Sequence, residues 1–261
     1  MPGFYESSTG LTIYGCNMTD HIQRLIELEA DVRYQELASD TEPEFRYISG
    51  DIPVLFSAPH GAVHTRMGNI KQEDEYTSGF ARLVAELSGA HVLYVRRKSL
   101  TDPNWHPLVP YKLALKQIVR DSGICCVLDM HGSSPKRHFG IALGMLRRAN
   151  SCPRYHDLIV RTLGDMDFTE DNDDRLSRLD IDHTFSGVGK RQQETITRYV
   201  WEKLRIPVVQ VELNAYLRVA AMRDDSSTER SNFLGKTDYI NRAIEAFVRV
   251  AEGIAKYCEP L

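Results

Sequence analysis

Val54-Leu-Phe-Ser-Ala-Pro-His-Gly61 is an apolar run that stops abruptly at a histidine and a glycine. The run has no helical spacing, so it predicts a short buried β-strand. Gly61 would let the backbone turn sharply where the strand ends. Ligands of open α/β sheets bind at the carboxyl ends of the strands, and His60 therefore stands where chemistry is expected.

Two later segments repeat this arrangement. Ile124–Gly132 is an apolar run with His131 near its end, and Pro207–Asn214 carries Glu212 two residues before its end. Carboxyl ends of parallel strands share one edge of a sheet, so these strands would bring two histidines and a glutamate together. The pattern predicts a metal-dependent hydrolase.

The bulk composition excludes several classes of protein. The chain has 261 residues, 42% of them hydrophobic, which is enough for one sizeable core. A net charge of −4 with interspersed charges argues against a nucleic-acid partner. No apolar run reaches the ~18 residues of a membrane span, and the first residues do not resemble a signal peptide. We therefore expect no membrane association.

The cysteines bear on the compartment. There are five, an odd number, and none forms a C-x-x-C pair. Cys125 and Cys126 lie in an expected strand, where cysteine usually acts as a small buried apolar residue. A cytoplasmic location follows as the simplest expectation.

Strands and helices are expected to alternate along the chain, which predicts a largely parallel sheet with right-handed crossovers. Residues 45–51 are expected to form an antiparallel hairpin with the strand that leads to His60. We expect one α/β domain, a mixed, largely parallel sheet flanked by helices. Residues 1–44 would be an N-terminal arm and helix packed on a catalytic body, 45–261.

Further elements are expected from local patterns. They are an early strand or arm at 12–14, helices at 20–32 (capped by Asp20), 73–89, 113–121, 155–163, 192–204 and from Thr237 (as cap) onward, strands at 91–95 and 138–144, and loop-rich segments at 165–174 and 185–190.

His60 and His131 are the sharpest candidates for chemistry. Neutral imidazoles are common zinc ligands, and a hydrolytic zinc site has three protein ligands and one open position. A single histidine in such a strand is more often a buried structural residue. Two histidines, each followed by glycine at a strand end, favour a site.

Acidic residues would complete the site. The Glu73–Glu75 cluster is the best source of a third ligand. Acidic residues are also common at the N-terminus of any helix, where they stabilise the helix dipole, so the cluster could have only that role. Glu212 lies in an apolar run, where a carboxylate needs a partner. A metal-activated water would be one partner and would make Glu212 a general base, whereas a buried arginine is the alternative. Asp129 would accept a hydrogen bond from a ligand or cap a strand.

Substrate-binding residues are harder to select. Arg66, Arg97 and Arg218 could bind a substrate carboxylate, but each is also typical of a protein surface. His64 and His138, in nearby loops, would orient substrate or lie on the surface. The chain has no nucleophile elbow, P-loop or dinucleotide-binding fingerprint, which argues against serine hydrolases, NTPases and Rossmann enzymes.

Taken together, these motifs resemble the N-formylglutamate amidohydrolase family, a branch of the zinc-carboxypeptidase-like α/β fold. The resemblance runs from about residue 50 to residue 220, and the order of the motifs carries it. The matching segments are Ser57–Gly61, Asp74–Thr77, Asp102–Asn104, Asp129–Gly132, Gly140–Gly144 and Gln210–Tyr216. The fold that it implies is phosphorylase/hydrolase-like.

The resemblance also implies roles for individual residues. It implies one zinc ion held by His60, His131 and Asp74, with Glu75 as the alternative to Asp74, and Glu212 as the catalytic glutamate. The residues that it implies on the substrate side are Arg97, Asn104, Asn214 and Tyr216. The chain departs from the family at Lys98–Asn104, where relatives are rich in arginine.

The expected function is therefore zinc-dependent hydrolysis of the amide bond of a small N-acyl amino acid, such as N-formylglutamate. Two alternatives stay open at this point: a metallopeptidase or amidase acting on γ-glutamyl or other acyl-amino-acid substrates, and a non-catalytic metal-binding relative. No part of the sequence indicates an oligomeric state.

Overall fold

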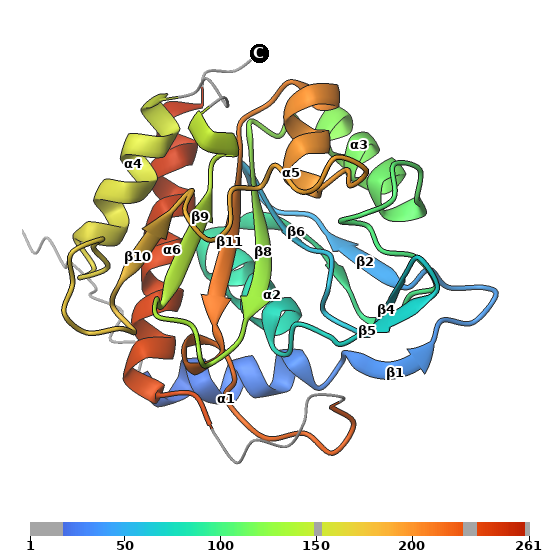
Figure 1. Cartoon of the computed structure of the whole chain (residues 1–261), viewed down its shortest axis with the longest axis horizontal. Helices are drawn as coiled ribbons and strands as arrows, with labels where there is room; N and C mark the ends of the chain where they lie inside the picture. Colours follow the sequence, from blue (N-terminus) through green and yellow to red (C-terminus); the bar gives the residue numbers. More distant parts are fainter. Residues whose placement is uncertain (1–17, 149–152, 227–233, 259–261) are drawn as a thin grey trace, which may run out of the picture.

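The computed structural model describes residues 18–148, 153–226 and 234–258, which form an α/β domain around a seven-stranded sheet (Figure 1). The strand order is β10-β9-β11-β8-β3-β6-β2. β6, β3, β8 and β11 are parallel neighbours, as predicted. β2 runs antiparallel to β6, and β9 runs antiparallel to β11 but parallel to β10. The strands are β2 (Phe45–Ile48), β3 (Ile52–Ala58), β6 (Ala90–Val95), β8 (Cys126–Ser133), β9 (Ile141–Gly144), β10 (Leu179–Ile181) and β11 (Val208–Asn214).

Helices cover both faces of the sheet. One face packs against α1 (Met18–Glu29), α2 (Thr77–Ser88), α4 (Pro153–Gly164) and α6 (Thr237–Tyr257). The other face packs against α3 (Pro110–Asp121) and α5 (Ile196–Tyr199), which continues into a π-helical turn, Val200–Leu204.

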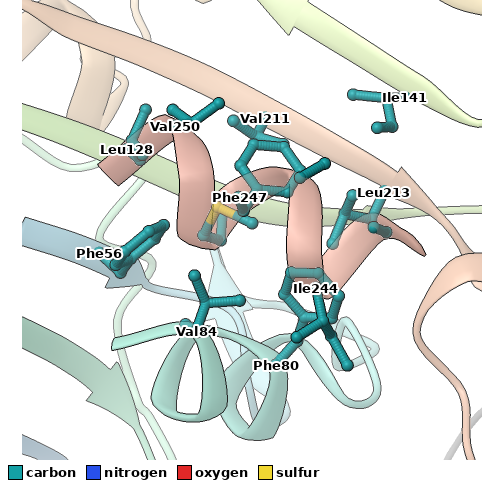
Figure 2. Packing of buried hydrophobic residues seen from close by; sticks show 14 of the residues in the cluster. Phe56, Phe80, Val84, Leu128, Ile141, Val211, Leu213, Ile244, Phe247 and Val250 are labelled. Carbon is teal, nitrogen blue, oxygen red and sulfur yellow. The ribbon is translucent and has the colours of Figure 1, made fainter. Parts of the chain in front are cut away.

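The apolar runs lack a period of two because both faces of the central strands are buried. Phe56 on β3 belongs to the core under α2 and α6, whereas its neighbour Leu55 belongs to the core under α3. Figure 2 shows Phe56 on the same side as Phe80 of α2 and Phe247 of α6. The rings of Phe80 and Phe247 meet edge to face, with centroids 6.2 Å apart.

The predicted hairpin between residues 45–51 and β3 is wrong. β2 pairs with β6 instead, placing Tyr47 opposite Leu93. Both edges of β3 are occupied by the parallel strands β6 and β8. The chain crosses the start of β6 at Gly50, where an added Cβ would lie 2.3 Å from the Ala90 carbonyl carbon. Glycine allows this close approach, so sequence neighbours need not be neighbours in the sheet.

Several short elements were not predicted. β1 (Arg33–Leu37) pairs with β7 (Arg97–Lys98), and β4 (His64–Arg66) forms a hairpin with β5 (Asn69–Lys71). β10 lies in a segment between the two predicted loops. These strands are too short to show a period, and the partners of β1 and β10 are distant in the sequence.

Helix ends also differ from the predictions. α1 ends at Glu29, so Val32 is buried beyond the helix rather than on its face. Thr237 is the first residue of α6 and not its cap, which is Lys236. α2 begins at Thr77, after the acidic cluster. The predicted strand at 12–14 and the side chain of Asp20 lie outside what the structure describes.

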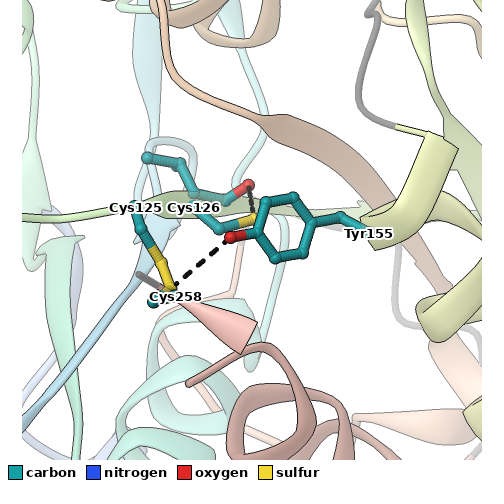
Figure 3. Close-up of a disulfide and its surroundings, with 5 residues drawn as sticks. Cys125, Cys126, Tyr155 and Cys258 are labelled. Atoms are coloured by element: carbon teal, nitrogen blue, oxygen red, sulfur yellow. Dashed lines mark hydrogen bonds between the residues drawn. A yellow bond between two sulfur atoms is a disulfide. The ribbon is translucent and has the colours of Figure 1, made fainter. Parts of the chain in front are cut away.

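Figure 3 shows a disulfide between Cys125, just before β8, and Cys258, just after α6. The hydroxyl of Tyr155 on α4 lies 3.7 Å from the Cys258 sulfur. The expectation that Cys125 is a plain apolar residue is wrong, whereas Cys126 is buried, as predicted. Disulfides are typical of oxidising compartments, so the cysteines do not support the predicted cytoplasmic location.

The disulfide closes a loop with a sequence separation of 133 residues. Cross-linking a long loop restricts the unfolded chain, so we expect Cys258→Ser to lower the free energy of unfolding by about 2–4 kcal/mol. Urea unfolding with and without a reductant would measure this. The reductant should destabilise the wild type and leave Cys258→Ser unchanged. A wild type indifferent to the reductant would contradict the prediction.

No helix in the described parts of the chain combines the length and apolarity needed to cross a membrane.

Candidate metal centre

Three side chains from separate elements converge at the carboxyl edge of the sheet. His60 follows β3, His131 lies in β8, and Asp74 precedes α2. Asp74 Oδ2 lies 3.5 Å from His60 Nδ1 and 3.4 Å from His131 Nδ1. The three potential ligand atoms lie within 4.8 Å of one another, and both imidazole rings are buried.

The two distances from Asp74 fit two edges of a zinc site shared with the histidines. They are longer than a good N–H···O hydrogen bond, which spans about 2.7–3.2 Å. A tetrahedral site with metal–ligand bonds of about 2.0–2.1 Å has edges of about 3.3–3.4 Å. Two imidazoles, one carboxylate and one open position are also the donor set of catalytic zinc sites.

The second nitrogen of each ring is held by a buried aspartate. His60 Nε2 lies 2.9 Å from Asp102 Oδ1, and His131 Nε2 lies 3.2 Å from Asp129 Oδ2. Both carboxylates are fully buried. Such carboxylate–histidine pairs fix the orientation of a metal-binding imidazole. The structure thus gives Asp129 the first of its two predicted roles, and Asp102 takes the same role for His60.

His64 supports His60 from the side. The two rings stack with centroids 4.1 Å apart, and His64 Nε2 lies 3.7 Å from Asp102 Oδ2. Burial, followed by the nearby charge of His60, lowers the pKa of His64 to about 3, so the ring is neutral at physiological pH. A ring that is 3% exposed packs against His60 rather than reaching a substrate.

Close packing around Gly61 leaves no room for a side chain. A Cβ there would lie 1.8 Å from Ser78 Oγ and 2.6 Å from the Val95 carbonyl oxygen. Ser78 in turn donates to that same carbonyl at 2.7 Å. The glycine after His60 therefore lets α2 and β6 approach the end of β3.

The loop before α2 brings Asp74, and not Glu75, to the two histidines. Asp74 N donates to the His60 carbonyl at 2.8 Å, and Thr77 Oγ1 donates to the Asp74 carbonyl at 2.7 Å. Tyr76 has a left-handed φ of 63°, which turns the chain between the loop and the helix. The Glu75 carboxylate does not belong to the cluster.

A buried carboxylate from α1 supports the same turn. Glu29 accepts hydrogen bonds from Tyr76 N at 2.9 Å and Gly79 N at 2.6 Å, and from the Tyr34 hydroxyl at 2.6 Å. These amides are donors that the helix itself cannot satisfy. Glu29 thereby caps α2 from a distant part of the chain and fixes the turn that carries Asp74.

The two histidines stabilise the ionised form of Asp74. Burial by itself would raise the pKa of Asp74, but the interactions with His131 and His60 outweigh it and hold this pKa well below its ordinary value. Asp74 is therefore ionised at neutral pH, as a metal ligand must be.

Glu212 lies beside the cluster. In the parallel pairing of β11 with β8 it stands opposite His131. Its carboxylate is buried and accepts a hydrogen bond from Gln210 Nε2 at 2.7 Å. Burial raises the pKa of Glu212 to about 7, although His131 opposes the rise. Among the described residues it has no arginine partner, so the salt-bridge alternative is wrong.

The cluster opens into a cavity of about 500 Å³. Its lining includes His60, Asp74, His131 and Glu212, together with three cationic residues, Arg66, Arg137 and Lys190. Arg66 is committed to Asp102, with Nε 2.5 Å from Oδ2.

Arg137 and Lys190 were not predicted. Within the described part of the chain neither has a carboxylate partner, and the guanidinium of Arg137 lies 5.2 Å from the ring centroid of Phe185. The signal that could have found Arg137 is its place in the loop directly after the His131 strand. Lys190 follows a glycine-punctuated segment that gave no functional signal.

Of the four residues predicted on the substrate side, only Asn104 lines this cavity. Its side-chain oxygen is already used, because it accepts from Ile196 N at 2.7 Å. Arg97 lies on β7 and donates to Glu36 at 2.9 Å, away from the cavity. Its strand pairs with β1, outside the main sheet.

Asn214 and Tyr216 also lie outside the cavity lining and contact other parts of the fold. Asn214 is fully buried, donates to the Phe139 carbonyl at 2.9 Å, and accepts from Tyr216 N at 3.1 Å. The ring of Tyr216 lies under the guanidinium of Arg175. Arg218 is buried and contacts backbone carbonyls, and His138 is exposed, so neither lines the cavity.

No family model matches the chain, and no curated protein is similar to it in sequence. Several solved structures resemble its fold. An N-formylglutamate amidohydrolase from Ralstonia eutropha gives a TM-score of 0.53 at 13% identity, covering 83% of this chain and 98% of that one.

Two further structures are less similar. A metallo-carboxypeptidase from Pseudomonas aeruginosa gives a TM-score of 0.46 at 14% identity, with 89% and 67% of the two chains covered. A bacteriophage poly-gamma-glutamate hydrolase gives 0.44 at 14% identity, with 84% and 92% covered. At such low identity the first of the three similarities establishes architecture alone: this chain shares the fold of an N-formylglutamate amidohydrolase, as its motifs predicted.

Proposed function

We propose that this chain is a zinc-dependent hydrolase that cleaves the amide bond of an N-acyl amino acid such as N-formylglutamate. The observation that carries the proposal is the distance from Asp74 Oδ2 to Nδ1 of His60 and to Nδ1 of His131, which matches two edges of a zinc site open to a cavity. Glu212 beside that opening and the shared fold support it.

Zinc bound by these three side chains would polarise the scissile carbonyl and acidify a water molecule. Glu212 takes the proton of the attacking water and returns it to the leaving amine. Gln210 holds Oε1 of Glu212, which leaves Oε2 for the water. Asp102 and Asp129 keep the Nδ1 atoms of the two histidines directed at Asp74.

Arg137 and Lys190, which have no carboxylate partner among the described residues, support a carboxylate-bearing substrate. Arg137 can hold a carboxylate in two parallel hydrogen bonds, and Lys190 can add a point charge. Binding the carboxylate there positions the amide at the opposite end of the substrate. In this proposal Arg137 has the role that the sequence suggested for Arg97.

The size of the cavity favours a second candidate, an amidase or peptidase acting on γ-glutamyl or other acyl-amino-acid substrates. Sites that enclose ligands the size of a drug molecule occupy about 300–1,000 Å³. A cavity of about 500 Å³ is therefore roomy for a formyl group and would accept a larger acyl group.

The experiment is elemental analysis of the purified chain, followed by assays with N-formyl and N-acetyl amino acids and with γ-glutamyl dipeptides. We expect about one zinc per chain. Hydrolysis of at least one class should be lost with a chelator and restored by zinc. The preferred class separates the two candidates. Zinc without hydrolysis of any of these amides would indicate a metal-binding module, and a chain without affinity for zinc would refute the proposal.

A further inference from the structure

A buried arginine lies behind the metal cluster. Arg218 follows the 3-10 turn Ala215–Leu217 and is 5% exposed. Its guanidinium donates to three backbone carbonyls from separate segments. They belong to Leu213, at 3.2 Å, Ser133, at 3.3 Å, and Glu75.

Each of these carbonyls lies one or two residues after a residue of the site along the chain. Leu213 follows Glu212, Glu75 follows Asp74, and Ser133 comes two residues after His131. One planar group therefore joins the ends of β11 and β8 to the loop before α2.

The guanidinium has no carboxylate within ion-pairing distance in the parts of the chain that the structure describes. Burying a charge is unfavourable unless hydrogen bonds compensate it, and these three carbonyls provide them. The carbonyls in turn gain donors at strand ends. Arginine has five N–H groups in a rigid plane, whereas lysine presents three from a single atom and cannot reach three separated segments equally well.

Gly132 makes room for this arrangement. A Cβ at Gly132 would lie 2.6 Å from Cζ of Arg218 and 2.6 Å from one of its terminal nitrogens. The glycine that follows His131 thus has a packing reason of its own, which is contact with the guanidinium.

We propose that Arg218 is a positioning residue that sets the spacing of His131, Asp74 and Glu212 by binding the backbone beside each of them. This inference rests on the proposed zinc function. Since the distances from Asp74 to the two histidine nitrogens match those between zinc ligands, small shifts of one segment against another would weaken metal binding. A purely structural role would instead lower stability without changing the zinc affinity of the folded protein.

The test compares Arg218→Lys with Arg178→Lys. Arg178 is a matched control because its guanidinium also binds a backbone carbonyl, that of Asn172, outside the cavity. Zinc affinity is measured by competition with a chromogenic chelator, at a temperature where circular dichroism shows each variant folded. We expect Arg218→Lys to bind zinc about 10–100-fold more weakly, as removal of supporting contacts does elsewhere. Arg178→Lys should match the wild type.

Gly132→Ala provides a second route if Arg218→Lys does not fold, because it retains the guanidinium and displaces it. Its control is Gly164→Ala, where an added Cβ meets nothing within 4 Å. Gly132→Ala should also weaken zinc binding. If the wild type binds zinc and a folded Arg218→Lys or Gly132→Ala binds it with the same affinity, the inference about Arg218 is wrong. The proposed zinc function would still stand in that case. A wild type that binds no zinc would overturn the proposed function and the inference with it.

Discussion

Glu212→Gln is expected to retain zinc and to lose about 10²–10⁴-fold in kcat, the range that a general acid–base residue contributes. Glutamine has nearly the same shape as glutamate, but its amide cannot take a proton from water. The metal ligands are untouched, so zinc content should stay at the wild-type level. Steady-state kinetics on the best substrate, together with elemental analysis, would measure both quantities.

Glu202→Gln is the matched control. Glu202 pairs with Arg198 on the surface, and its side chain is 49% exposed. The same chemical change there should leave kcat unaltered. Full turnover by Glu212→Gln would remove Glu212 from the mechanism, even if the zinc site were correct.

His131→Ala is expected to bind zinc more than about 100-fold more weakly, since loss of supporting residues alone costs about 10–100-fold. The change removes one of the three proposed ligands and leaves Asp129 buried without its histidine partner. Hydrolysis should fall with the zinc content. Chelator competition and elemental analysis provide the measurement.

His21→Ala serves as the control, because His21 lies on α1 and does not line the cavity. It should keep wild-type zinc affinity. If His131→Ala bound zinc as tightly as the wild type, the cluster of His60, Asp74 and His131 would not be the metal site.

The local sequence pattern was enough to predict the central strands of the sheet. A strand covered on both faces is apolar along its whole length, so β3, β8 and β11 were visible in the sequence as runs. Parallel strands place their carboxyl ends together, which is why His60, His131 and Glu212 could be grouped without coordinates. The α/β class followed from the same runs, whereas the fold likeness followed from the resemblance of the ordered motifs to a known family.

The third member of the cluster needed the tertiary structure. The family resemblance implied Asp74 with Glu75 as the alternative, but the two are adjacent in the sequence and no local signal separates them. The left-handed turn at Tyr76 and its anchoring by Glu29 of α1 decide which carboxylate faces the histidines. The pairing of β2 with β6 and the disulfide between Cys125 and Cys258 also join segments that are distant in sequence.

The arginines show most clearly which features could be predicted from the sequence and which needed the tertiary structure. The sequence alone predicted which residues would follow the ends of the buried strands, because an apolar run and the direction of the chain through it can be seen locally. It could not separate Arg97, which binds Glu36, from Arg218, which binds three carbonyls, or from Arg137, which lines the cavity. A long, flexible cation has similar propensities in all three places, and only its partners in the folded chain decide which role it takes.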